Sequence, residues 1–280
     1  MTSIAVVTGG AGSMGSACAT ALASDVDVVL LSDIDAQRLE VVGKEVQQTT
    51  TANIVTTVGD LGDPHFALDL ATRSAELGEL RALVHTAGLS PAMAGWHEIL
   101  RVDLVASARL LEAFLPLVVK GSVAVCVASV SGHMGEFDPA MDAVLDEPLA
   151  ADLEARFVSA AGDEPDAGNT YRLAKRGVIR MCRRAAIEWG AQGGRVISLS
   201  PGLIDTEMGR LELQHQPIKQ WLAEITPVSG ERSEPDTVLP GRTHHISDTV
   251  AFLCSKHAEF ISGCDILVDG GLLAALEHSS

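Results

Sequence analysis

Short apolar runs recur along the chain, with longer amphipathic stretches between them. The runs show no alternation of polar and apolar residues, a pattern typical of strands buried on both faces of a parallel sheet. The predicted strands cover residues 4–8, 26–31, 54–58, 82–86, 123–128, 195–199 and 265–268. The predicted helices include residues 36–48, 63–77, 96–115 and 170–191. Strands that alternate with helices predict right-handed βαβ units in an α/β fold, a doubly wound parallel sheet with helices on both faces.

Two segments interrupt this alternation. Residues 137–169 lie between a predicted strand and a predicted helix and carry helix signals of their own. The expected helix starts are Asp138-Pro139 and Glu147-Pro148, and the expected apolar face holds Leu149, Leu153 and Phe157. Residues 206–245 contain four prolines, and a long segment of that kind is usually functional or mobile. We expect a helical insertion at the first segment and a mobile substrate lid at the second.

A glycine cluster, Thr-Gly-Gly-Ala-Gly-Ser-Met-Gly at residues 8–15, follows the first predicted strand and opens an Ala-rich helix. In this setting Gly9 allows the tight turn, Gly12 lets the backbone approach a pyrophosphate, and Gly15 allows close helix packing. The free N–H groups at the helix start would face the phosphate charge. We therefore predict a single Rossmann-type domain over residues 1–280, whose dinucleotide loop contains Gly9, Gly12, Ser13, Met14 and Gly15.

Asp33 ends the second predicted strand, 18 residues after Gly15. A carboxylate at this place can accept hydrogen bonds from both ribose hydroxyls of NAD. The 2′-phosphate of NADP would instead meet a negative group, with a repulsion of about 1 to 4 kcal/mol per unit charge at contact distance. Ile34 follows, and the glycine loop holds no Lys or Arg that would compensate. The sequence therefore predicts NAD as the cofactor, with Asp33 and Ile34 among its contacts.

Composition and charge exclude several other classes. The chain has 20 Lys and Arg against 37 Asp and Glu, a formal net charge of −17, which argues against a nucleic-acid partner. The apolar runs are too short to span a bilayer, and we see no export signal, so we expect no membrane partner. Five cysteines without a CxxC motif favour a reduced, cytoplasmic protein. The pairs His244-His245 and His97-Glu98 lack a third ligand at sensible spacing, so we expect no metal.

Tyr171 and Lys175 form a Tyr-x-x-x-Lys pair, which lies on one face of a helix. A phenol with a pKa near ~10 is a poor base at neutral pH, and a nearby ammonium lowers that pKa. Tyr171 could then take a proton from an alcohol while hydride leaves its carbon. An exposed helix pair is the alternative interpretation of this spacing. Tyr171 is, however, the only tyrosine in the 280 residues.

With these motifs in order, the chain resembles the short-chain dehydrogenase/reductase family over nearly its whole length. The matching pieces are residues 8–15, Asp60-Leu61, His85-Thr-Ala-Gly88, Ser129, Tyr171 with Lys175, Pro201-Gly202 and Val268-Asp-Gly-Gly271. The resemblance implies an oxidoreductase in which Tyr171 is the acid/base and Lys175 also holds the nicotinamide ribose. It also implies that Ser129 positions the substrate oxygen, with Ser131 as its competitor for this role.

The resemblance extends to further cofactor contacts. It implies that Asp60 and Leu61 hold the adenine, and the other implied contacts are Ala87, Gly88, Pro201, Gly202, Ile204 and Thr206. One position departs from the family pattern, because Asp103 stands where the family has an asparagine that holds a relay water. Aspartate can still accept a hydrogen bond from water or lysine but donates none when it is ionised.

Ser129 and Tyr171 are 42 positions apart, a longer gap than most members of the family have. The long insertion, followed by Gly-Asn-Thr-Tyr, resembles the bacterial 3α-hydroxysteroid dehydrogenase/carbonyl reductase group. This implies ketone or secondary alcohol substrates, with steroids among the candidates. His133, Met134 and Met208 are candidate substrate contacts, although loop or helix packing explains each of them almost equally well.

The insertion has its own electrostatic character, because residues 138–168 hold nine acidic residues against the single Arg156. The helix that follows carries an arginine stripe on the face away from Tyr171 and Lys175, formed by Arg172, Arg176, Arg180, Arg183 and Arg184. Either the acidic insertion covers this stripe, in its own subunit or a partner's, or the two faces are solvated separately. Since the family often pairs through this helix, we expect a homodimer or a homotetramer.

Two other functions stay open. A catalytically impaired regulatory or scaffold protein with the same fold is compatible with Asp103, but the intact set Ser129, Tyr171 and Lys175 argues against it. A dehydratase or epimerase of the same family is suggested only by the spacing of the three loop glycines. The chain lacks room for the substantial C-terminal substrate domain that such an enzyme would need.

Overall fold

The computed structural model describes residues 1–136, 138–162, 164–228 and 239–278. Its centre is a seven-stranded parallel sheet with the strand order β3-β2-β1-β4-β5-β6-β7. The strands are β1 Ser3–Thr8, β2 Val28–Asp33, β3 Asn53–Val58, β4 Glu79–His85, β5 Val123–Val127, β6 Arg195–Pro201 and β7 Asp265–Val268. The predicted doubly wound sheet is confirmed, with a strand at each predicted place.

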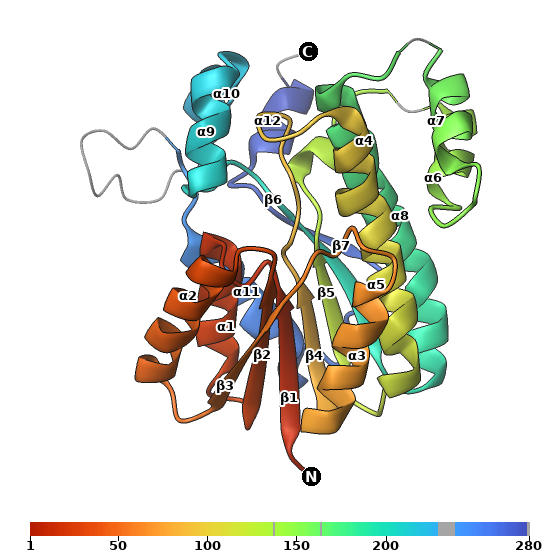
Figure 1. The fold of residues 1–280 in the computed structure, drawn as a ribbon. Coiled ribbons are helices and arrows are strands. Elements are labelled where there is room, and N and C mark those ends of the chain that lie inside the picture. Colours follow the sequence, from red (N-terminus) through yellow and green to blue (C-terminus); the bar gives the residue numbers. More distant parts are fainter. Residues whose placement is uncertain (137, 163, 229–238, 279–280) are drawn as a thin grey trace.

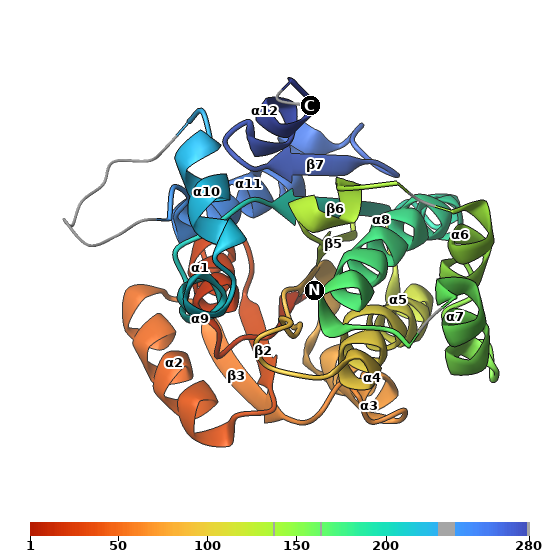
Figure 2. The ribbon, with the colours of Figure 1, turned by 90° about the horizontal axis from the view of Figure 1, so that it is seen from above.

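Helices cover both faces of the sheet, as Figures 1 and 2 show. One face carries α1 Ser13–Leu22, α2 Ala36–Thr49 and α11 Thr243–Cys254. The other carries α3 Phe66–Leu77, α5 Ala106–Phe114 and α8 Ala167–Ala191. The chain leaves β1 in one direction for β2 and β3, and then returns to add β4 to β7 on the other side. Such a switch in direction opens a crevice at the carboxyl ends of the strands, where ligands bind in this architecture.

Two helix boundaries differ from the prediction. The start expected at Asp63-Pro64 is wrong, because α3 begins at Phe66. The carboxylate of Asp63 accepts a hydrogen bond from the His65 amide at 2.9 Å, and this closes a separate turn before the helix. The helix predicted over 96–115 is divided into α4 Trp96–Ile99, a π-helical stretch Leu100–Val105, and α5. A π-helical turn of this kind often occurs at a functional site.

The insertion contains two helices, α6 Pro139–Leu145 and α7 Leu153–Ala161. The start predicted at Asp138 is confirmed, since its side chain accepts from the Ala140 amide at 2.8 Å. The start predicted at Glu147-Pro148 is wrong, because the chain forms turns there and α7 begins only at Leu153. Leu149 is consequently 37% exposed, whereas Leu153 and Phe157 are buried as expected.

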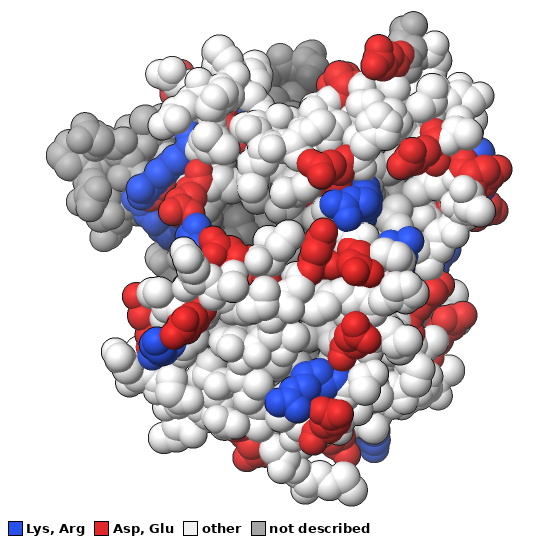
Figure 3. All heavy atoms as spheres, in the orientation of Figure 1, with Lys and Arg blue, Asp and Glu red and all other residues white. Residues whose placement is uncertain are grey.

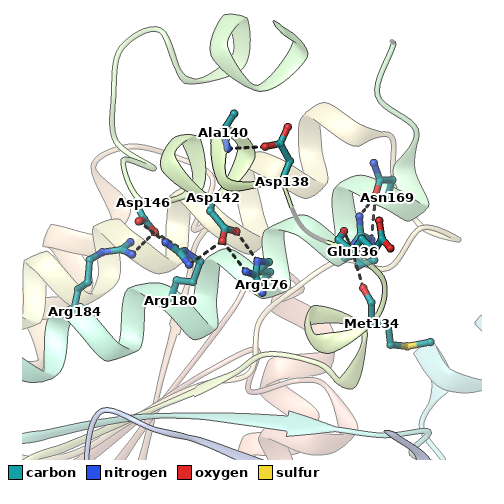
Figure 4. A network of polar contacts seen from close by, with 11 residues as sticks. Met134, Glu136, Asp138, Ala140, Asp142, Asp146, Asn169, Arg176, Arg180 and Arg184 are labelled. Carbon is teal, nitrogen blue, oxygen red and sulfur yellow. Dashed lines mark hydrogen bonds and ion pairs between the residues drawn. The ribbon is translucent and has the colours of Figure 1, made fainter. Parts of the chain in front are cut away.

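Helix α6 lies over the arginine stripe of α8 within the same chain (Figure 4). Asp142 contacts Arg176 at 2.5 Å and 2.6 Å and Arg180 at 3.0 Å. Asp146 pairs with Arg180 at 2.6 Å and also with Arg184. These guanidinium groups lower the pKa of both carboxyl groups. The interpretation that the acidic insertion covers the stripe in its own subunit is confirmed for these three arginines.

Two smaller helices, α9 Glu207–His215 and α10 Ile218–Ile225, lie above the carboxyl ends of the strands, and α12 Leu272–His278 lies near them (Figure 1). Helices α9 and α10 belong to the predicted lid, residues 206–245, of which residues 229–238 lie outside the described part of the chain. Acidic side chains are spread over the face in Figure 3, with basic ones lying among them. No helix among the described residues combines the length and apolarity that a bilayer span requires.

Candidate active site

A cavity of about 730 Å³ opens at the carboxyl ends of the strands, beneath α9 and α10. The loops after β1, β2, β4, β5 and β6 all contribute to its wall, which is the expected crevice. Many of the residues predicted for the site line it, namely Gly9, Gly12, Ser13, Met14, Gly15, Asp33, Ile34, Asp60, Leu61, Ala87, Gly88, Ser129, Tyr171, Lys175, Pro201, Gly202, Ile204, Thr206 and Met208. The fold thus brings together residues from across the chain.

The glycine loop turns tightly and leaves no room for a side chain at Gly9 or Gly15. Gly9 has a φ of +68°, and a Cβ there would lie 2.6 Å from the Ala87 amide nitrogen. A Cβ on Gly15 would lie 2.2 Å from the carbonyl oxygen of Gly9. A Cβ on Gly12 would meet only that same oxygen within 4 Å, so it would enter the space that a phosphate needs. Gly12 also begins α1 without a side-chain cap, which leaves the first N–H groups of the helix available to an anion.

Asp33 is fixed at the wall of the cavity by two backbone amides. Its Oδ2 accepts from Ala11 N at 3.0 Å, and its Oδ1 accepts from Asp35 N at 3.1 Å. Arg38, which the motifs do not indicate, also lines this part of the cavity and pairs with Glu207 of α9. Its position in the first turn of α2, five residues after Asp33, is the signal in the sequence that points to it.

Asp60 lies in a turn after β3, where its Oδ1 accepts from the Gly62 amide at 2.7 Å. Its Oδ2 lies 3.5 Å from Arg101, which also lines the cavity. Leu61 beside it is 7% exposed and offers an apolar surface. This wall suits a flat ring that needs a few fixed polar contacts, as the prediction for adenine requires.

Tyr171, Ser129 and Lys175 meet at the end of the cavity nearest to α8. Ser129 follows β5, and the two other residues lie about one turn apart on α8. The hydroxyl of Ser129 lies close enough to the phenol of Tyr171 to lower its pKa. The Lys175 Nζ lies 5.5 Å from the centre of the Tyr171 ring and donates to the carbonyl of Val127 at 3.4 Å. The predicted catalytic set therefore converges on one point.

Ser131, the competitor of Ser129, does not line the cavity as the structure describes it. Its hydroxyl lies 2.9 Å from that of Ser129, which is close enough to orient it. Of the two serines, Ser129 therefore lines the cavity and Ser131 lies behind it.

Asp103 lies directly under the lysine. Its Oδ2 is 3.2 Å from Lys175 Nζ, and its Oδ1 accepts from the Leu89 amide at 2.7 Å. Both side chains are almost fully buried, with exposed fractions of 0% and 7%. The carboxylate thus forms an ion pair with the ammonium directly, at the position where a relay water was expected. Asp103 lies in the π-helical stretch Leu100–Val105.

The pKa of Tyr171 differs from the expectation. It is raised above the ordinary value of a phenol, first by burial and then by the negative charges of Glu212 and Asp103. The hydrogen bond from Ser129 acts in the opposite direction. The lowering that the neighbouring Lys175 predicts is therefore not found in the protein alone. Asp103 explains part of this difference, because its carboxylate lies 3.2 Å from the Lys175 ammonium and compensates its positive charge.

His85, which the sequence offers only as part of a motif, links three elements beneath the cavity. One ring nitrogen lies 2.7 Å from the Thr8 hydroxyl and the other 2.8 Å from the Ser107 hydroxyl. Ser107 in turn donates to the carbonyl of Asp103 at 2.7 Å. Burial, assisted by the charge of Lys175, lowers the pKa of His85 to about 3. His85 is therefore a neutral bridge between β1, β4 and α5.

Because His85 is buried in its neutral form, we expect the free energy of unfolding to fall in acid. Because the unfolded chain protonates His85 below about pH 6.5 and the folded chain does so only near pH 3, stability is lost as the pH falls through that range. The loss amounts to roughly 5 kcal/mol in the free energy of unfolding at the acid end. His85→Gln keeps a donor and an acceptor but does not titrate, so its stability should fall roughly 3 kcal/mol less between pH 6.5 and 4.

Urea unfolding at a series of pH values measures this difference. His257→Gln, at an exposed position, is the matched control and should follow the parent curve. Parallel curves for the parent and His85→Gln would contradict the buried neutral state of His85.

Two predicted substrate contacts lie away from the cavity. Among the described residues, those that line it do not include His133 or Met134. His133 Nε2 instead lies 2.8 Å from Asp265 Oδ2, and the carbonyl of Met134 accepts from Arg172 at 2.9 Å. The structure thus gives both residues a packing role, whereas Met208 does line the cavity. In the described ranges, no group of three or more potential ligands has the arrangement of a metal site.

Comparison with known proteins agrees with this geometry. A family model described as "short chain dehydrogenase" matches residues 3–141, and one described as "Enoyl-(Acyl carrier protein) reductase" matches residues 156–273. A 3-alpha-hydroxysteroid dehydrogenase/carbonyl reductase from Comamonas testosteroni is 30% identical over 204 residues, which cover 69% of this chain and 73% of that protein. A cis-4-hydroxycyclohexanecarboxylate dehydrogenase from Sinomonas cyclohexanicum is 27% identical over 271 residues, with 97% and 96% covered.

Among solved structures, levodione reductase has a TM-score of 0.77 at 22% sequence identity, with 97% of this chain and 98% of that chain covered. This likeness concerns the fold. Together with the sequence matches, it shows that the chain belongs to the short-chain dehydrogenase/reductase family. The protein is accordingly an oxidoreductase of alcohol or ketone substrates, with a fold that binds a nicotinamide cofactor.

Proposed function

We propose that the protein interconverts a secondary alcohol and the corresponding ketone with NAD, using Tyr171 as the acid/base. The observation that carries this proposal is that the only tyrosine, Ser129 and Lys175 come together at the wall of the cavity, with the Lys175 Nζ 5.5 Å from the centre of the Tyr171 ring. Asp33, Asp60, the glycine loop and the segment from Pro201 to Thr206 fit the cofactor beside this point.

Each residue has a defined task in alcohol oxidation. Tyr171, as phenolate, takes the hydroxyl proton of the substrate, while Ser129 donates a hydrogen bond to the oxygen that gains charge. NAD, when bound, supplies the acceptor for the hydride that leaves the carbon. Lys175 orients the ribose and favours the phenolate. In ketone reduction Tyr171 returns the proton.

Two observations bear on the choice between NAD and NADP. The Asp33 carboxylate is fixed where it would accept from ribose hydroxyls and repel a 2′-phosphate. Arg38 nearby favours the phosphate, but its guanidinium already pairs with Glu207. NAD is therefore the preferred cofactor of the proposal.

The substrate is proposed to be a hydroxysteroid or a similar alicyclic, mainly apolar compound. Apolar side chains dominate the substrate end of the cavity, among them Met93, Leu203, Met208, Leu211 and Leu239. The name of the relative from Comamonas testosteroni supports the same class. Helices α9 and α10 are proposed to close over this end as a lid.

Asp103 is proposed to set the pH range of the reaction. Lys175, Asp103 and Glu212 are the charged groups that face Tyr171, and the two carboxylates raise its pKa. Asp103→Asn removes one of these charges and leaves Lys175 uncompensated, so the pKa of Tyr171 should fall. We expect the acid limb of kcat/KM for alcohol oxidation to move to lower pH by about one unit, which is about tenfold in rate below the limb.

A pH series of initial rates for the parent and Asp103→Asn checks this expectation. NADH binding, followed by fluorescence, should be similar in both proteins and reports that the variant is folded. A limb that stays in place or moves upward would remove the role given to Asp103. Loss of all activity in the variant would instead indicate that proton relay depends on the carboxylate.

The proposal also covers the cellular compartment and the oligomeric state of the enzyme. The five cysteines are free thiols, as a reducing cytoplasm favours. The cover of α6 over α8 closes a face through which the family often pairs, and we propose a homodimer or homotetramer built with other surfaces.

Formation of NADH from NAD and a panel of alicyclic secondary alcohols tests the function directly. Turnover of at least one alcohol, and of its ketone in reverse, is the expected result. Binding of NADH without turnover of any alcohol or ketone would favour a regulatory or scaffold protein, the alternative to which the raised pKa of Tyr171 gives some support.

A further inference from the structure

An ion pair lines the substrate end of the cavity. Glu212 of α9 and Lys219 of α10 both belong to its wall, and their charged atoms Oε2 and Nζ are 3.3 Å apart. The side chains are only 11% and 15% exposed. Their neighbours along the wall, such as Met208 and Leu211, are apolar. Two charges are thus held in a place that otherwise suits an apolar substrate.

Stability alone explains this pair poorly. Taking two charges out of water costs several kcal/mol per ion, and the mutual attraction often fails to offset that cost. Apolar residues at both positions would join α9 to α10 at least as well. A buried polar pair that faces a substrate cavity is therefore more readily explained by recognition.

Glu212 lines the same cavity as Tyr171, and its carboxylate retains unused acceptor capacity. Its negative charge is one of those that raise the pKa of Tyr171. Within the described part of the chain, Lys219 is its one polar partner. An ionised carboxylate offers about four acceptor positions, and one ammonium does not occupy them all.

We propose that Glu212, held in place by Lys219, recognises a second hydroxyl group on the substrate. The substrate class is then a diol or hydroxy ketone on an alicyclic skeleton. This inference rests on the proposed function and sharpens it, because it makes Glu212 a residue that determines specificity.

The neutrality of the pair selects a hydroxyl over a charged group. A substrate carboxylate would be attracted by Lys219 but repelled by Glu212 at a distance of 3.3 Å from it. A substrate ammonium would meet the opposite conflict. A neutral hydroxyl can donate to the carboxylate and accept from the ammonium, so it satisfies both groups.

Rates with matched cyclohexane substrates test this inference. The panel consists of cyclohexanol, the cis and trans isomers of 1,2-, 1,3- and 1,4-cyclohexanediol, 4-aminocyclohexanol and 4-hydroxycyclohexanecarboxylate. We expect at least one diol to exceed cyclohexanol in kcat/KM by roughly 10- to 100-fold, the factor that a hydrogen bond to a charged group gives. That preference, taken as the ratio of the two kcat/KM values at the same pH, should disappear in Glu212→Leu and be partly kept in Glu212→Gln. The charge of Glu212 also acts on Tyr171, but this effect is common to all the substrates and cancels in the ratio.

Glu224→Leu, on the exposed side of α10, is the matched control and should keep the preference. NADH binding shows that each variant is folded. An equal loss for all substrates would overturn the inference, because it would mean that the pair only joins the helices. A preference for the amine or the carboxylate would overturn it as well. If cyclohexanol is oxidised without any diol preference, the inference alone fails; if nothing is oxidised, the proposed function fails too.

Discussion

Tyr171→Phe should lower kcat for alcohol oxidation by about a thousandfold, with the affinity for NADH nearly unchanged. Phenylalanine keeps the partly buried ring but removes the hydroxyl that is proposed to take the alcohol proton. Positioned acid/base groups contribute roughly 10² to 10⁴ to the rate, and the substitution also removes the phenol on which Ser129 acts. Initial rates of NADH formation and a fluorescence titration with NADH measure the two quantities.

The serine pair provides a matched control for this loss. Ser129→Ala should reduce kcat strongly, because Ser129 contacts Tyr171 and lines the cavity. Ser131→Ala should reduce it only slightly, since Ser131 reaches the site only through its 2.9 Å contact with Ser129. Retention of more than about a tenth of kcat in Tyr171→Phe would assign the proton transfer to another group.

Asp33→Ser should shift the cofactor preference toward NADP by about tenfold or more, expressed as the ratio of kcat/KM for the two cofactors. The substitution removes the repulsion of about 1 to 4 kcal/mol between the carboxylate and a 2′-phosphate. It also removes acceptors for the ribose hydroxyls, so the rate with NAD should fall. The serine can still accept from the Ala11 amide, which keeps the loop in place.

A second variant, at Arg38, separates the loss of repulsion by Asp33 from the attraction of the 2′-phosphate by Arg38. In Asp33→Ser/Arg38→Leu the gain with NADP should largely vanish, because Arg38 is the cation at the same wall that can reach the phosphate. An unchanged ratio in Asp33→Ser would show that Asp33 does not contact the ribose. A parent protein that prefers NADP would show that Arg38 outweighs the carboxylate.

The features that local pattern encodes could be predicted from the sequence. Buried parallel strands are short apolar runs, and the cofactor loop after β1 is a glycine spacing tied to a strand and a helix. The Tyr171 and Lys175 pair needs only the helical repeat. All of these signals lie within a few residues of each other, so one sequence is sufficient to find them.

Features that depend on distant parts of the chain were missed or misplaced. The contact between Asp103 and Lys175 joins residues far apart in sequence, and Asp103 lies in a π-helical stretch that no propensity indicates. Glu212 reaches the cavity only because α9 folds over the strand ends. Glu147-Pro148 resembles a helix start and so predicts an earlier start for α7. The chain instead forms turns between Leu145 and Leu153, and α7 begins at Leu153.

The pKa of Tyr171 likewise depends on residues that are distant in the sequence. The neighbouring lysine predicts a lowered value, but burial, Glu212 and Asp103 together raise it in the protein alone. An acid/base role at neutral pH then requires a further positive charge near the ring. The oxidised nicotinamide ring carries such a charge, so cofactor binding should activate the tyrosine.

Titration of Tyr171 by tyrosinate absorbance tests this account most directly, because no other tyrosine contributes to the signal. The predicted result is a pKa above the ordinary phenol value of about 10 in the protein alone, and one well below it when NAD is bound. A titration curve that saturating NAD leaves unchanged would contradict the claim that Tyr171 is the acid/base beside a bound nicotinamide.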